Sequence, residues 1–406
     1  MVIEQECPQC GASIKLSETD HIFTCPYCDV MSYLHTPSYF RYLLPHKALD
    51  KDIIYVPYLR FKGIVFFCDG IKIKHRIIDI TQTGVRFKGI PISLGLRPQA
   101  MTARFATDET HGSFMRFSLR ATDILARASK LTQESAGNKL LHRAFIGETM
   151  SIIYLPVYVE RDRIFDAILK RPITGIKGGR DTIEPVLIKR FPETVTFIPT
   201  ICPRCGWTMS GEKDSVVLLC DNCGNAWEPQ GTRFVQLEKV IASNKNNNSV
   251  YLPFWKITAK TKGVNIKSFA DFVRITNQPI ILNEEHETID MSYWCPAFKI
   301  RPKMFLNLSK QLTVMQNFFE NTDSIPEKGL YPVTLPSSEA VQSLKIILAA
   351  SAITKRNVYP YLPKINLNIK KKKLVFLPFR ETRNDMIQDD LGLSVNRQSL
   401  ELGRGL

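Results

Sequence analysis

The chain has 406 residues, which suffices for about two or three domains, and its 44% hydrophobic and 23% charged residues exclude a disordered polypeptide. The 54 Lys and Arg outnumber the 39 Asp and Glu, so the formal net charge is +15. Such an excess favours an acidic partner, which is nucleic acid, an anionic membrane surface or an acidic protein face.

No secretory signal is visible in the first residues, and no apolar run reaches the ~20 residues that a transmembrane helix needs. We therefore expect a cytoplasmic protein without a transmembrane segment. Contact with a membrane surface from outside the bilayer stays open. In a reducing compartment, paired cysteines more often hold a metal ion than form disulfides.

Four cysteines lie near the start of the chain, in the stretch CPQCGASIKLSETDHIFTCPYC. They form two CxxC pairs separated by fourteen residues, and they are Cys7, Cys10, Cys25 and Cys28. A CxxC turn directs two thiolates at one ion, so two such turns complete a tetrahedral Cys₄ site. Gly11 follows the first pair, where a tight turn needs a residue that tolerates a positive φ.

Beyond the first cysteine motif, residues 59–63 and 71–77 alternate apolar with basic side chains, which predicts two strands. Their basic residues are expected to point outward from one sheet face as a phosphate-binding surface or as an ordinary charged surface; they are Arg60, Lys62, Lys72 and Lys74. Both interpretations remain open from the sequence.

A second cysteine motif follows in the stretch ICPRCGWTMSGEKDSVVLLCDNC. It has the same spacing as the first, and its members are Cys202, Cys205, Cys220 and Cys223. Trp207 and Trp227 accompany this motif, and we expect them to bind a partner, as anchors on a protein or as platforms for bases.

Both motifs resemble the zinc-ribbon family, in which two cysteine turns on short hairpins hold one zinc ion. The resemblance covers about a tenth of the chain, and it implies two structural zinc ions bound by eight cysteines. A rubredoxin-like iron site and a pair of disulfides are the alternatives. The resemblance implies no particular activity, since zinc ribbons occur in nucleic-acid-binding proteins, in enzymes and in assembly modules.

The two halves of the chain share more than the cysteines. The segment IYVPY at 54–58 matches VYLPF at 250–254, and IYLPV at 153–157 matches VFLPF at 375–379. Matches in the same order predict an internal duplication. The prolines inside these strand-like segments predict sheet edges, bulges or strand starts, because proline has no N–H for the ladder.

The later part of the chain carries helical patterns. Pro302 suits the first turn of a helix, and Ser338 is expected to cap the next one. We expect an α+β fold with two β-rich lobes, each preceded by a zinc ribbon. The boundaries are 1–36 for ribbon 1, 37–195 for lobe 1, 196–231 for ribbon 2 and 232–406 for lobe 2.

The sequence contains no nucleotide-binding loop, metalloprotease or hydrolase signature. Cys68 and Cys295, the two cysteines outside the motifs, have apolar neighbours and predict buried inert thiols. We therefore expect a non-enzymatic scaffold or adaptor that assembles a protein complex and binds proteins with acidic surfaces. Nucleic-acid binding through the ribbons and the basic strands is the alternative, and an enzyme with a site between the lobes is the third hypothesis.

Overall fold

The computed structural model describes residues 1–119, 140–176, 179–188, 194–243, 249–317, 319–322 and 329–405. The chain divides into two compact units. Unit 1 consists of Met1–Lys62, Ile78–Ala136 and Thr149–Pro199, and unit 2 consists of Gly63–Ile77, Gly137–Glu148 and Thr200–Leu406. Both units combine sheets with helical segments, so the predicted α+β class is confirmed.

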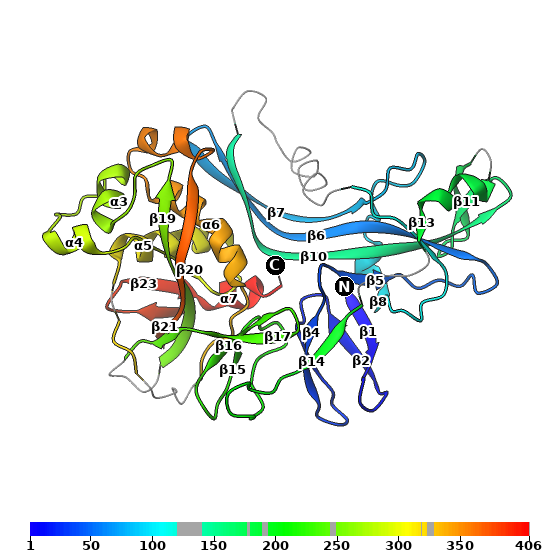
Figure 1. Ribbon diagram of the computed structural model, residues 1–406, viewed down its shortest axis with the longest axis horizontal. Coiled ribbons are helices and arrows are strands. Elements are labelled where there is room, and N and C mark those ends of the chain that lie inside the picture. The colour runs from blue at the N-terminus through cyan, green and yellow to red at the C-terminus, as the bar shows by residue number, and fades with distance from the viewer. Residues whose placement is uncertain are drawn as a thin grey trace. The chain divides into compact units, whose positions relative to one another are not determined.

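Most of unit 1 is built from strands (Figure 1). Its strands and helices are β1 (Val2–Glu6), β2 (Ser13–Ser17), β3 (Ile22–Thr24), β4 (Met31–His35), β5 (Phe40–Leu43), α1 (Arg97–Ala100), β8 (Thr102–Phe105), β9 (Ser113–Met115), β11 (Arg163–Asp166), β12 (Arg171–Gly175), η1 (Gly179–Thr182), η2 (Glu184–Val186), β13 (Leu187–Ile188) and β14 (Thr196–Pro199). Three longer strands, β6 (Ile53–Asp69), β7 (Lys72–Thr83) and β10 (Leu140–Glu160), have residues in both units.

Strands β6 and β10 are neighbours in the main sheet, whose order is β13-β9-β6-β10-β5-β8-β1-β2. Within unit 1, alternate residues of β6 pack into two separate clusters. Ile54, Val56 and Tyr58 belong to one cluster. Ile53 and Tyr55 belong to the other. The strand is therefore apolar and buried on both faces, a pattern typical of a central strand.

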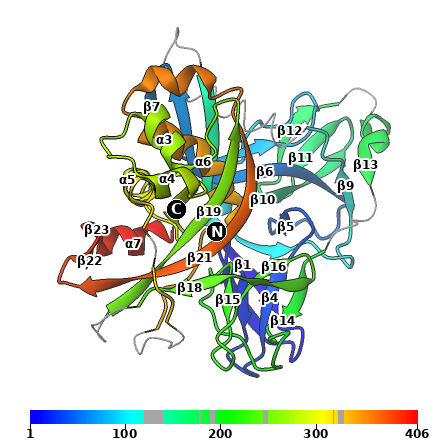
Figure 2. The same cartoon turned by 60° about the vertical axis from the view of Figure 1, so that its left-hand side comes forward.

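Unit 2 carries the longer helices (Figure 2). Its elements are β15 (Leu218–Leu219), β16 (Ala226–Gln230), β17 (Arg233–Leu237), β18 (Lys239–Ile241), β19 (Ser249–Lys262), α3 (Phe269–Thr276), α4 (Glu284–Thr288), β20 (Ser292–Pro296), α5 (Pro302–Met315), α6 (Ser337–Ser351), η3 (Lys355–Asn357), η4 (Tyr359–Tyr361), β21 (Asn366–Glu381), β22 (Asp385–Gln388), β23 (Leu393–Asn396) and α7 (Arg397–Gly403). The sheet order is β20-β19-β21-β22-β23, with β18 beside β21.

Helices α5 and α6 pack on this sheet and on each other. The largest hydrophobic core lies here and includes Trp255, Phe305 and Leu344. Ile64, Phe66, Ala144 and Ile146 contribute to the same core. The sequence assigns those residues to lobe 1, and their apolar side chains explain why the structure places them in unit 2. None of the described helices is both long enough and apolar enough to cross a membrane.

The helix predictions have different outcomes. Helix α5 begins at Pro302, as predicted. The prediction that Ser338 caps the next helix is wrong, because α6 begins one residue earlier, at Ser337, and Pro336 occupies the cap position without a side-chain hydrogen bond. In unit 1, Arg97 and Pro98 begin only the single turn α1. The spacing of Ala121, Leu125, Ala128 and Leu131 predicts a second helix there, but these residues lie outside the described part of the chain.

The strand prolines lie in interior strands rather than in edge strands, which differs from the simplest expectation. For three of the four prolines, the hydrogen bond that the carbonyl accepts explains the arrangement. The carbonyl of each of these prolines accepts a hydrogen bond from a backbone N–H outside its own strand. The pairs are Pro57 with Gly84, Pro156 with Ala167 and Pro253 with Ala297. Each donor directly follows the end of a neighbouring strand, namely β7, β11 and β20. Within a strand, the nitrogen and the carbonyl of one residue point to the same neighbouring strand. The nitrogen of each proline therefore faces the point where the neighbouring strand has just ended, and no ladder hydrogen bond is lost there.

Candidate metal centres

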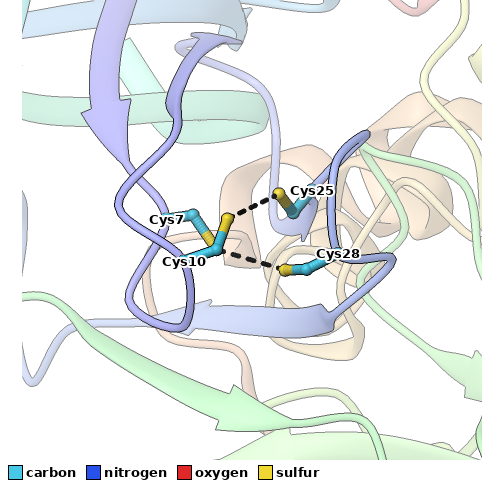
Figure 3. Close-up of side chains that lie close together, drawn as sticks. All are labelled: Cys7, Cys10, Cys25 and Cys28. Atoms are coloured by element: carbon cyan, nitrogen blue, oxygen red, sulfur yellow. Dashed lines mark hydrogen bonds between the residues drawn. The ribbon is translucent and has the colours of Figure 1, made fainter.

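The first cysteine cluster is built by two hairpins of unit 1. Cys7 and Cys10 lie in the turn between β1 and β2, which pair from Val2↔Ser17 to Glu6↔Ser13. Cys25 and Cys28 lie in the turn between β3 and β4. Figure 3 shows the four thiols converging from the two turns. The hairpins therefore bring together two CxxC pairs that are separated by fourteen residues in sequence.

The distances between the thiols fit one tetrahedral ion. The Sγ atoms of Cys7 and Cys28 are 3.7 Å apart, and those of Cys10 and Cys25 are 3.6 Å apart. All four sulfurs lie within 4.8 Å of one another. A zinc ion with four bonds to sulfur of about 2.3 Å places its sulfurs about 3.8 Å apart. A disulfide, by contrast, requires a separation of about 2 Å.

Backbone hydrogen bonds fix the shape of each turn in the first cluster. The N–H of Gly11 donates to the carbonyl of Cys7, and the N–H of Asp29 donates to the carbonyl of Cys25. Gly11 has a φ of 73° and Asp29 a φ of 54°. Residues with a positive φ are required here, which explains the glycine after the first pair and a tolerated aspartate after the second.

The second cluster, in unit 2, repeats this geometry. Its Sγ atoms are 3.6 Å apart for Cys202 and Cys223, and 3.4 Å apart for Cys205 and Cys220. The N–H of Gly206 donates to Cys202, as the N–H of Gly224 does to Cys220. The described residues thus contain two groups of four cysteines with the arrangement of a metal site.

Hydrogen bonds in the second cluster favour the thiolate form at Cys205 and Cys223, whereas burial raises the pKa of Cys220 to about 12. The side-chain amide of Asn225 donates to the Sγ of Cys223 over 3.1 Å. Hydrogen bonds from the side chain and backbone of Asn225 lower the pKa of the Cys223 thiol to about 6. Hydrogen bonds from the Asn222 side chain and the Trp207 backbone lower the pKa of Cys205. N–H donors of this kind orient metal-ligating sulfurs.

In each cluster, the first cysteine of each CxxC pair is buried; the second is exposed, except Cys223, which is half-buried. The two buried thiols of the first cluster, Cys7 and Cys25, belong to a hydrophobic core that also contains Phe23 and Ile14. Cys10 and Cys28 are exposed. A bound ion would therefore join exposed turns to the packed core of the same unit, which is the role of a closed structural site.

The basic residues predicted from the two strands are not placed as expected. The prediction that Arg60 points outward is wrong, because its side chain is buried in unit 1. Its guanidinium donates to Glu18 over 2.7 Å and to Asp79 over 2.7 Å. Since β6 is packed on both faces, an arginine within it is buried, and it needs those carboxylates as partners.

The other three lysines divide between the units. Lys62 is partly buried in unit 1. Lys72 and Lys74 belong to unit 2. Lys72 is exposed, and Lys74 forms an ion pair with Asp69 at 2.8 Å. Their part in binding a partner stays a prediction.

The two predicted tryptophans have opposite environments. Trp207 follows the first turn of the second cluster and is 60% exposed. Ile201, which precedes the same turn, is 54% exposed. Trp227 lies in β16, is only 6% exposed, and pairs across the hairpin with Leu218. Trp207 is therefore available to a partner, whereas Trp227 supports the hairpin from inside.

One pair of ionisable groups was not foreseen from the sequence. In unit 2, the carboxylate of Glu339, at the start of α6, accepts from the N–H groups of Gly147 and Glu148, the latter over 3.1 Å. Burial, followed by repulsion from Glu148, raises the pKa of Glu339. The partners are 191 residues apart, so no local signal in the sequence could have revealed the pair.

No protein family, curated protein or solved structure matches the chain in the comparisons made with each.

Proposed function

We propose that the protein is a zinc-binding scaffold that holds other proteins together, with one structural zinc ion in each cysteine cluster. Support for zinc comes from all-thiol ligands at tetrahedral spacing, a set that suits a closed structural site. The roles follow from the geometry. The eight cysteines would hold the ions, and the rigid turns would present neighbouring side chains to partners.

Exposed apolar side chains on ribbon 2 carry the proposal. Trp207 and Ile201 bracket the turn that holds Cys202 and Cys205, and more than half of each residue is exposed. Tryptophan is enriched among the residues that dominate protein–protein binding energies. A metal-fixed turn would present these side chains in one conformation, and less entropy would be lost on binding.

An internal duplication is part of the proposal, and the ribbons support it. Shifting Cys7 by 195 residues gives Cys202, and the same shift relates the hydrogen bonds of the two clusters. It also relates the pair Thr24↔Met31 of the β3–β4 hairpin to the pair Leu219↔Ala226 of the β15–β16 hairpin.

A second shift, of 222 residues, supports the duplication in the rest of the chain. It relates β11 to β22, because the first and last residues of β11 shift onto those of β22. The pair Tyr158↔Phe165 then corresponds to Arg380↔Ile387. The parallel pairing of β5 with β10 also has a counterpart in β18 with β21. We propose that the two lobes offer related surfaces to partners.

The proposal also includes a non-enzymatic role, protein partners and a cytoplasmic location. A non-enzymatic role is supported by Cys68 and Cys295, which are fully buried and whose thiol pKa burial raises to about 12. For nucleic acid, the support is weaker: Arg60 is buried, and in the basic run 370–373 of β21 both Lys371 and Lys373 pair with Glu238. Protein partners are therefore the better-supported class, and a cytoplasmic site of action is part of the same proposal.

The experiment is affinity purification of the tagged full chain from cells that naturally produce it, at moderate salt, with and without nuclease. The wild type is compared with Trp207→Ser. The matched control is Ile281→Ser, which also removes an exposed apolar side chain from unit 2, since Ile281 is 94% exposed.

The scaffold proposal predicts a defined set of proteins that survives nuclease treatment, is depleted with Trp207→Ser and is retained with Ile281→Ser. Loss of all accompanying proteins after nuclease would instead identify nucleic acid as the partner. If the two variants recovered the same proteins as the wild type, Trp207 would not be an anchor.

A further inference from the structure

A small cavity in unit 1 has no cysteine among its described lining residues. It has a volume of about 110 Å³, and its walls come from the segments after β7, around the end of β9 and in η2. The lining residues are Val85, Arg86, Phe87, Met115, Arg116, Ser118, Pro185 and Val186. Sites for small molecules usually measure about 300–1,000 Å³, so this cavity has room for a single side chain.

Backbone hydrogen bonds hold the two arginine-bearing segments in place. Arg86 donates its N–H to the hydroxyl of Ser118, and that hydroxyl donates to the carbonyl of Gly84. Arg116 donates its N–H to the carbonyl of Val186. Both arginines are exposed at their side chains but fixed at their backbones.

Gly84 contributes to this arrangement through close packing. A β-carbon at this position would lie 2.2 Å from the ring of Phe117, so only glycine lets the two segments approach this closely. The N–H groups of Ser118 and Leu119 both donate to the carbonyl of Gly84. The cavity is therefore formed before any ligand arrives.

The charged side chains that line the cavity have one sign. Two of its described lining residues are arginines, and none of them is acidic. The floor is apolar, with Met115 and Val85 buried. A ligand that matches this surface has an apolar side chain for the cavity and carboxylates beside it for the guanidinium groups, which bind carboxylates in bidentate geometry.

We propose that this cavity binds an acidic peptide segment of a partner protein, with one aliphatic side chain in the cavity and flanking carboxylates on Arg86 and Arg116. This inference rests on the proposed scaffold function and specifies the chemistry of one partner. Peptides match better than free metabolites because the cavity holds one side chain, and better than nucleic acid because its floor is apolar.

The test uses the full chain and a short synthetic peptide in which a leucine stands between two pairs of glutamates, with binding measured by calorimetry. Two control peptides replace the leucine with serine or the glutamates with glutamines. The protein variants are Arg86→Gln and Arg116→Gln. Arg163→Gln removes an exposed arginine elsewhere in unit 1 and serves as the matched control.

We expect saturable binding to the wild type, weakened about tenfold by Arg86→Gln and by Arg116→Gln and unchanged by Arg163→Gln, because each variant removes a charge-assisted contact. Both control peptides should bind more weakly than the parent. Unfolding midpoints of the variants should equal that of the wild type, since only side chains beyond the fixed backbones change.

Absence of saturable binding to the wild type, or equal affinity in the arginine variants, would overturn the cavity assignment. The native purification is an independent readout. If it recovers partners while the peptide fails to bind, the scaffold proposal stands and the cavity inference fails. If the peptide binds as expected but no protein co-purifies, the cavity binds acidic peptides and the scaffold proposal fails.

Discussion

Glu339 is a buried carboxyl group whose environment opposes ionisation. It accepts hydrogen bonds from two backbone N–H groups, which lower its pKa. Burial and repulsion from the neighbouring Glu148 have the larger effect and raise the pKa to about 8. Burial also raises the pKa of Glu148 to about 7, against the opposing charge of Lys299. Because both pKa values exceed those of the unfolded chain, protonation favours folding.

The sign of the pH dependence follows. The contribution of Glu339 to stability is present in full below its unfolded pKa of about 4.5 and is lost as the pH rises toward 8. We predict that the wild type loses on the order of 2–4 kcal/mol relative to Glu339→Gln between pH 5 and pH 8. Denaturant unfolding of both proteins at several pH values measures this difference. Parallel pH profiles would contradict the prediction.

The two tryptophans of ribbon 2 provide a second test at the scale of residues. Trp207→Ser should change the free energy of unfolding by no more than about 0.5 kcal/mol, because the side chain is exposed. Trp227→Ala should cost about 3–5 kcal/mol, because it empties a buried site. Chemical denaturation compares them, and a large loss of stability in Trp207→Ser would show that this residue is structural.

The sequence predicted residues well where the signal is local. The cysteine clusters follow from spacing alone, since short hairpins bring the CxxC turns together. Arg60 was misjudged because alternation in the sequence cannot reveal that β6 is covered on both faces. Glu148 and Glu339 were missed because only tertiary packing makes them neighbours.

Among the elements, the turns that connect β11 to β12 and β22 to β23 each contain a residue in the left-handed backbone conformation. Lys170 has a φ of 52° in the first turn and Gly392 a φ of 60° in the second. The carboxylate of Asp166 accepts from the N–H of Leu169, and the side chain of Gln388 accepts from the N–H of Leu391. The two turns therefore differ mainly in the residue at the left-handed position.

We predict opposite effects of substitutions at these positions. Gly392→Ala should destabilise the protein by about 1 kcal/mol through backbone strain, since a β-carbon there meets no atom within 4 Å. Lys170→Gly should relieve the same strain and stabilise by up to about 1 kcal/mol. Denaturant unfolding of both variants measures the changes in the free energy of unfolding. Changes of the same sign in the two variants would contradict the prediction.

The hairpins that would hold the metal also permit a test of whether the two clusters bind metal independently. Replacing Cys202 and Cys205 with serine should remove one metal ion per chain and leave the first cluster loaded, because each cluster draws all its ligands from one unit. The reciprocal variant with serine at Cys7 and Cys10 should behave in the same way. Elemental analysis of the purified variants measures this, and unchanged metal content would disprove the four-cysteine assignment.

At the scale of the whole molecule, the sequence predicted the α+β class but misplaced a boundary. The strand segments Gly63–Ile77 and residues 140–148 belong to unit 2, although the chain reaches them from unit 1. Long strands obscure such a boundary, because no break in composition marks the point where β6 or β10 leaves one core and enters another.

The metal content and X-ray absorption spectrum of the purified full chain would decide whether it contains two structural zinc sites. We expect two zinc ions per chain, each bound by four sulfurs at about 2.3 Å. Iron in their place, nitrogen or oxygen ligands in the first coordination shell, or less than one metal ion per chain with the eight cysteines oxidised would contradict this expectation.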